Sequence, residues 1–115
     1  MPSVLIVESE EPLVRLMSWF LIEAGFEVTA VKDAYTALER FPASRPDVII
    51  VNTHLPEPAK RDYIERWRAA TRDAKVLDVV DAAPSAPSGA DAVLRLPFHA
   101  DTLIETVQNL ISAGK

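Results

Sequence analysis

Oxygen-bearing side chains are the groups in this 115-residue chain that could carry chemistry. Cysteine is absent, which excludes a thiol nucleophile, a cysteine–zinc site and an iron–sulfur cluster. Gly25, Gly89 and Gly114 lie too far apart to build a glycine-rich loop around a phosphate. His54 and His99 are too few for a zinc site made from histidine alone. What remains is a large set of carboxylates, the groups that hold Mg²⁺ and other hard cations.

An acidic turn follows the first apolar run, residues 4–7. Glu8, Glu10 and Glu11 could bind a divalent cation through their carboxylates. Negative charge is also what the amino terminus of a helix attracts, because the helix dipole stabilises it there. The choice between these interpretations depends on which other residues the fold brings beside the turn.

Short apolar runs alternate along the chain with segments of helical periodicity. The runs predicted to be strands are 4–7, 26–31, 47–51, 76–80 and 92–95. The segments predicted to be helices are 12–24, 33–41, 63–70 and 103–111. Repeated strand–helix units indicate a single domain, 1–115, with a parallel sheet covered on both faces. The third run is the most apolar and is predicted to be central, whereas the second alternates in polarity, as an edge strand does.

The helices carry apolar stripes that predict which side faces the core. The stripe of the first helix contains Leu13, Leu16, Met17, Phe20 and Leu21. The stripe of the third contains Tyr63, Ile64 and Trp67. The basic residues between Lys60 and Arg72 are interleaved with acidic ones, which is typical of a solvated helix face rather than a nucleic-acid patch.

Four stretches of the sequence, in this order, resemble the receiver domain of two-component response regulators. They are residues 4–15, 23–28, 46–56 and 89–98. The resemblance implies an α/β, flavodoxin-like fold: a doubly wound, five-stranded parallel sheet of order 2-1-3-4-5, with the site outside the carboxyl ends of the strands. It also implies a cis peptide bond before Pro97. The segment 81–91 has no helical pattern and is shorter than the family's, so the fourth helix is expected to be shortened or absent.

The family transfers a phosphoryl group to an aspartate with the help of Mg²⁺, a lysine and a hydroxyl, and this sequence departs from that pattern. The acceptor position is Asn52, whose amide cannot form an acyl phosphate. Of the acidic pair, Glu8 remains but its neighbour is Ser9. Val80 stands at the hydroxyl position and Leu96 at the lysine position. We therefore expect a degenerate pocket without metal, cofactor or catalytic residue, and an acidic turn that serves the helix behind it.

The loop before the last strand would change the face that receivers use for output. Pro84 and Pro87 lie in this loop, and Val93 stands where the family has an aromatic residue that changes rotamer on activation. Asp78 completes the predicted interaction face, because a missing helix would leave its strand open to water or to a partner.

A second explanation stays open for Asp78, which lies inside a strand predicted to be covered. An unpaired buried carboxylate is costly, so a salt bridge with Lys75 or Arg95 would explain the residue equally well.

The function favoured by these features is a receiver-like signalling module of the two-component phosphorelay family. It is expected not to be an enzyme, not to be phosphorylated, and to act in the cytoplasm through protein–protein contacts. Its partner would be a signalling protein or an output domain beyond Lys115, and a homodimer stays open. A net charge of −5 argues against direct nucleic-acid binding, and no stretch is long enough for a membrane span.

Two other functions are weighed against this one. The emptied pocket could bind a small ligand or anion, with Asn52, Thr53, His54 and His99 as polar contacts. Alternatively, the chain could be an enzyme in which the phosphoacceptor has moved to Glu8 or Asp81, although no lysine stands where it would offset the developing charge.

Overall fold

The computed structural model describes residues 2–33, 36–39, 45–51, 57–70, 73–81 and 89–113. Its elements are β1 (Ser3–Val7), α1 (Glu11–Glu23), β2 (Glu27–Val31), β3 (Val48–Val51), α3 (Glu57–Ala70), β4 (Lys75–Val80), β5 (Ala92–Arg95) and α4 (Ala100–Ala113). Residues 36–39 are also helical. No helix in these ranges is long and apolar enough to cross a membrane.

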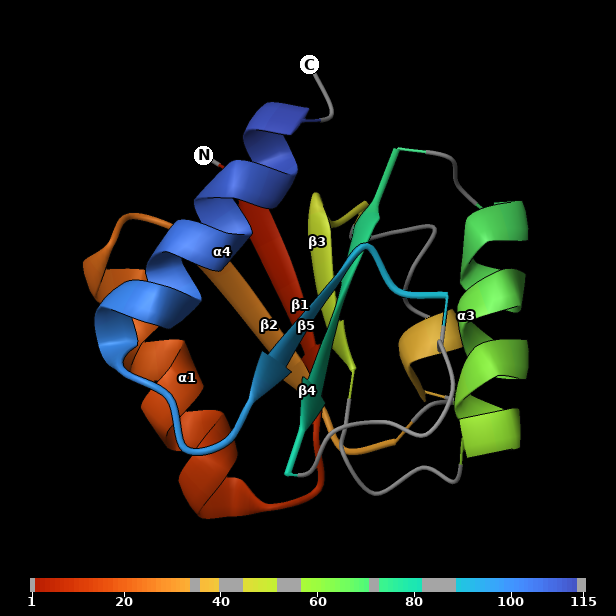
Figure 1. Ribbon diagram of the computed structural model, residues 1–115, viewed down its shortest axis with the longest axis horizontal. Helices are drawn as coiled ribbons and strands as arrows, with labels where there is room; N and C mark the ends of the chain where they lie inside the picture. The colour runs from red at the N-terminus through yellow and green to blue at the C-terminus, as the bar shows by residue number, and fades with distance from the viewer. Residues whose placement is uncertain are drawn as a thin grey trace.

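The five strands form one parallel sheet in the order β2-β1-β3-β4-β5 (Figure 1). The predicted order is therefore confirmed, with β3 in the centre and β2 at an edge. The register places Val7 beside Val51, Val51 beside Asp78 and Asp78 beside Val93. Because all strands run the same way, their carboxyl ends meet at one edge of the sheet.

Helices cover both faces of the sheet, and each face has its own core. In Figure 1, α1 and α4 lie on one side, and α3 with residues 36–39 lies on the other. The first core contains Met17 and Leu21 of α1 and Leu103 of α4, packed against alternate sheet residues. The second core contains Ile64 and Trp67 of α3. They pack against the sheet residues that alternate with those of the first core. Trp67 is buried, as its place in the predicted stripe indicates.

One residue of the predicted stripe on α1 faces outward. Leu16 is 48% exposed, so its assignment to the core is wrong. Met17 and Leu21 set the core-facing side of α1, and consecutive helix positions are rotated by about 100°. The Leu16 side chain therefore points away from the sheet.

A glycine turn joins α1 to β2. Gly25 has a φ of +96°, a conformation that side-chain-bearing residues rarely adopt. Its amide donates to the carbonyl of Ile22 at 3.0 Å, which satisfies one of the last carbonyls of the helix. The helix thus ends where the sequence places its stop signal.

The connection between β4 and β5 is described only at its ends. Asp81 and residues 89–91 are not helical, and residues 82–88 lie outside the described residues. The prediction of a shortened fourth helix falls on this stretch, as do Pro84 and Pro87. The helix labelled α4 is the carboxyl-terminal one, predicted at 103–111.

Asp91 ties the end of α3 to the start of β5. Its Oδ2 accepts a hydrogen bond from the Val76 amide at 2.8 Å and one from Arg68 at 2.9 Å. Arg68 also donates to the carbonyl of Gly89 at 2.8 Å. One half-buried carboxylate therefore holds a strand amide and a helix side chain together.

An Asp91→Ala variant should lose about 1–3 kcal/mol of unfolding free energy, because the buried Val76 amide would lose its acceptor. Asp91→Asn keeps a carbonyl oxygen at this position and should lose less. Urea unfolding followed by circular dichroism measures both values. Equal stability of the alanine variant and the wild type would show that water replaces the carboxylate at no cost.

Candidate functional site

Three of the predicted site residues meet at the carboxyl edge of the sheet. Glu8 directly follows β1, Val80 ends β4 and Leu96 directly follows β5. The Glu8 amide donates to the carbonyl of Val31 at 3.1 Å, and the Leu96 amide donates to the carbonyl of Val80 at 2.7 Å. These bonds extend the sheet by one step, so the positions of all three residues follow from the strand register. The Leu96–Pro97 peptide bond is cis, as the resemblance implies.

Three further site residues follow β3 in the chain. Asn52, Thr53 and His54 lie outside the described residues, so their predicted roles stay predictions. Val51, the last residue of β3, is paired with Val7 of β1, the residue before Glu8.

The Glu8 side chain is used within the turn that leads into α1. It is only 2% exposed, and its Oε1 accepts a hydrogen bond from the Glu10 amide at 3.1 Å. Ser9 beside it is exposed, and Glu11 places an acidic group in the first turn of the helix. Within the described ranges, no three acidic or histidine side chains converge in a way that would hold a metal ion. These contacts support the interpretation of the acidic turn as the start of a helix.

The hydroxyl and lysine positions carry buried or half-buried aliphatic groups. Val80 is 8% exposed, and Leu96 packs against the core beneath α1 and α4. Neither side chain can donate a hydrogen bond or carry a charge. Leu96 in addition contributes apolar contacts that a lysine would not make.

A buried ion pair lies close to this edge, because Asp78 is two residues before Val80 in β4. Asp78 of β4 is 1% exposed and Lys60 of α3 is 4% exposed, and the Lys60 Nζ lies 2.7 Å from the Asp78 Oδ1. Both explanations offered for Asp78 are therefore wrong, since the residue is neither exposed nor paired with Lys75 or Arg95. It points, like Val76 two residues before it, toward the face that α3 covers.

Lys60 was also misplaced by the expectation of a solvated helix face. It lies in the first turn of α3, three and four residues before Tyr63 and Ile64. That spacing puts Lys60 on the same side of the helix as the core stripe. Two features of the sequence could have indicated this pair. They are the spacing of Lys60 from the core stripe of α3 and the position of Asp78 in an apolar strand. Because Asp78 is buried, only Val93, at 47% exposure, keeps its place on the predicted interaction face among the described residues.

Tyr63, next to Lys60 on the inner side of α3, is a packing group. Its ring contacts Trp67 with centroids 4.5 Å apart and planes tilted by 58°. Burial raises the pKa of the Tyr63 phenol far above its usual range. Tyr63 therefore belongs to the core under α3.

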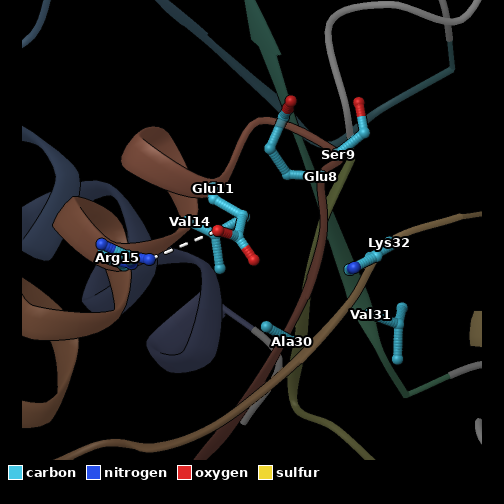
Figure 2. A pocket seen from close by; sticks show the side chains of 8 residues that line it. All are labelled: Glu8, Ser9, Glu11, Val14, Arg15, Ala30, Val31 and Lys32. Atoms are coloured by element: carbon cyan, nitrogen blue, oxygen red, sulfur yellow. Dashed lines mark hydrogen bonds and ion pairs between the residues drawn. The ribbon is translucent and has the colours of Figure 1, made fainter.

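A small pocket lies between the acidic turn and the end of β2 (Figure 2). It measures about 160 Å³ and is lined by Glu8, Ser9, Glu11, Val14, Arg15, Ala30, Val31 and Lys32. Glu11 and Arg15 pair across its rim at 3.3 Å. Sites for small organic ligands usually measure 300–1,000 Å³, so this one is small for such a ligand. His99 does not line it; its carbonyl instead accepts hydrogen bonds from the amides of Thr102 and Leu103 in the first turn of α4.

Comparison with known proteins agrees with the fold and the edge just described. Residues 4–108 match the response regulator receiver domain family. The sensory transduction protein RegX3 of Mycolicibacterium smegmatis is 32% identical over 123 residues, which cover 99% of this chain and 52% of RegX3. The virulence transcriptional regulatory protein PhoP of Salmonella typhimurium is 30% identical. The alignment covers 96% of this chain and 52% of PhoP. The chain thus spans about half the length of these curated relatives.

Solved receiver structures superpose on nearly the whole chain. Chemotaxis protein CheY4 of Vibrio cholerae has a TM-score of 0.84 at 26% identity, covering 96% of this chain and 98% of its own. A CheY-like receiver domain from Methanospirillum hungatei has a TM-score of 0.88 at 19% identity, with 99% and 96% covered. The chain belongs to the response regulator receiver domain family, a class of two-component signalling domains.

Proposed function

We propose that this chain is a receiver module that is not phosphorylated and signals through contacts with other proteins. The observation that carries the proposal is the chemistry at the carboxyl edge of the sheet. Val80 and Leu96 offer no hydroxyl and no ammonium group there, and the Glu8 carboxylate is bonded to the turn of α1.

Phosphoryl transfer to a receiver requires a carboxylate nucleophile and a bound divalent cation. The residue at the acceptor position is Asn52, and a neutral amide neither attacks phosphorus nor attracts Mg²⁺. Ser9 removes a second carboxylate from the cation's neighbourhood. Without a lysine at Leu96, charge that develops on the transferred group would also lack a counter-charge. The change to Asn52 alone removes the nucleophile, and the changes to Ser9 and Leu96 remove a metal ligand and the electrostatic support.

The test is to incubate the chain with acetyl phosphate or beryllofluoride and Mg²⁺. The response regulator TrrA of Thermotoga maritima, 25% identical and crystallised with Mg²⁺ and BeF, is a suitable positive control. We expect TrrA to respond and this chain to keep its intact mass and its amide chemical shifts. A gain of one phosphoryl group, or Mg²⁺-dependent shifts in the residues around Glu8, would refute the proposal.

The partner in this proposal is a protein. The curated relatives are about twice as long as the aligned part, so one candidate is an output domain on the same polypeptide. A separate signalling protein of the cytoplasm is the other. A copurification experiment with the native gene product distinguishes the two, because only the second appears as an additional chain.

A further inference from the structure

We infer that two copies of this chain associate through the outer face of α1, with the two helices antiparallel and Trp19 at the two-fold axis. This deepens the proposed function by naming a partner for the module. The inference depends on α1 alone, so it can fail while the absence of phosphorylation stands.

The outer face of α1 carries most of the exposed large apolar side chains in the described part of the chain. Trp19 is 68% exposed, Ile22 57% and Leu16 48%, and the fourth such residue is Val93 of β5. Met17 and Leu21 face the core, so the three exposed residues of α1 are on the side that the sheet does not reach. An exposed tryptophan flanked by two aliphatic residues is typical of an interface.

A shallow groove runs beside Trp19. It measures about 380 Å³ and is lined by Pro12, Arg15, Leu16, Trp19 and Phe20. Buried aromatic anchors supply much of the energy of protein interfaces. The groove extends the apolar surface beside Trp19 on which a second copy can pack.

The chemistry of α1 is palindromic about Trp19. Leu16 lies three residues before it and Ile22 three residues after it, and both are apolar and exposed. Arg15 lies four residues before it and Glu23 four residues after it, and these exposed residues have opposite charges. Positions three and four apart share one side of a helix. All five residues therefore lie on the outer side of α1.

A palindrome of this kind is complementary to itself when two helices run antiparallel. A two-fold axis at Trp19 places each residue of one helix opposite a residue of the second helix. The two residues are equally far from Trp19 in the sequence, one before it and one after it. Leu16 then contacts Ile22 of the second copy, and Arg15 contacts Glu23 of the second copy. Both contacts occur twice, as in any isologous interface. A parallel arrangement would instead place Arg15 beside Arg15 and Glu23 beside Glu23, which is repulsive.

The charges of α1 are available for this arrangement. The Arg15 side chain is 80% exposed, and its pair with Glu11 at 3.3 Å is a surface contact of the weak kind. Within the described ranges Glu23 has no ion-pair partner, and the last turn of α1 has no basic residue. The carboxyl end of a helix favours a cation. Arg15 of the second copy would supply one at this end.

The first measurement is sedimentation velocity of the 115-residue chain over a range of concentrations. We expect a dimer that dissociates on dilution, and a Trp19→Ala variant that binds at least about 30-fold more weakly. Trp67 is buried, so a blue shift of tryptophan emission with concentration would report burial of Trp19. Glu65→Ala is the control, an exposed residue of α3 on the opposite face of the sheet from α1 (Figure 1), and should dimerise normally. Circular dichroism checks that each variant is folded.

Charge reversal tests the antiparallel geometry. Arg15→Glu places two glutamates opposite each other, and Glu23→Arg places two arginines opposite each other, so each variant alone should be largely monomeric. A mixture of the two should form heterodimers, and the Arg15→Glu/Glu23→Arg double variant should dimerise again. Wild type that stays monomeric at about 1 mM would overturn the inference. A dimer whose affinity is unchanged by both charge reversals would also overturn the inference. Neither result affects the proposal that the chain is not phosphorylated.

Discussion

A Lys60→Met variant should lose about 3–5 kcal/mol of unfolding free energy, the largest effect on stability that we predict for a single substitution. The Lys60 Nζ and the Asp78 Oδ1 lie 2.7 Å apart between α3 and β4, and both side chains are almost fully buried. Methionine keeps most of the volume but removes the charge. The buried Asp78 carboxylate would then lose its partner, which is far costlier than a lost surface contact.

Two further variants separate the ion pair from other effects of the substitution. Lys60→Met/Asp78→Leu replaces both charges with apolar groups of similar size and should recover most of the lost stability, because no buried charge is left unpaired. Arg66→Met is the matched control on the same helix, since Arg66 pairs with Asp62 at 3.0 Å on the surface. It should change the unfolding free energy by less than about 1 kcal/mol. Chemical unfolding of all four proteins measures these values, and a double variant no more stable than Lys60→Met would argue against the pair as the cause.

The pattern of apolar residues accounts for the fold because burial on two faces leaves a clear mark on the sequence. Val4 and Ile6 of β1 pack under α1 and α4, whereas Leu5 and Val7 pack under α3. A strand that is apolar at every position belongs in the middle of a parallel sheet, and the run at 47–51 is central for this reason. Strand order itself came from the resemblance, because periodicity says nothing about which strands are neighbours.

The sequence was less informative about pairs and faces. Asp78 and Lys60 are 18 residues apart, and nothing local specifies that one is the partner of the other. Their pairing depends on how α3 lies across β4, a tertiary arrangement. The prediction that Leu16 faces the core was wrong for a related reason. An apolar residue on a helix can face a core or a partner, and composition does not distinguish the two. Glu8, Val80 and Leu96 were easier to place, because each of them ends a strand or directly follows one.

Restoring two carboxylates should restore cation binding if the pocket has lost only its ligands. In a Ser9→Asp/Asn52→Asp variant, the new groups would follow β1 and β3, whose last residues Val7 and Val51 are register partners. Two charges attract each other by about 1 kcal/mol at 4 Å in bulk water, so two carboxylates beside a divalent cation contribute roughly 4 kcal/mol. We expect Mg²⁺ affinity to rise on the order of 1,000-fold, measured by calorimetry or amide shifts. Gln108→Glu/Asn109→Asp adds the same charge on exposed positions of α4 and should not bind Mg²⁺ in this way.

One further substitution should make phosphorylation of the restored aspartate more complete. Leu96 packs against the core under α1 and α4, so Leu96→Lys removes apolar contacts as well as adding an ammonium group. We expect the triple variant, Ser9→Asp/Asn52→Asp/Leu96→Lys, to gain the mass of one phosphoryl group from acetyl phosphate with Mg²⁺, more fully than the double variant. The lysine acts on the transferred group rather than on the metal, so it should change phosphate uptake while leaving Mg²⁺ affinity nearly constant. A triple variant that binds Mg²⁺ but takes up no phosphate would show that the edge of the sheet has diverged in shape as well as in chemistry. The buried Val80 at the hydroxyl position would then be the next residue to replace.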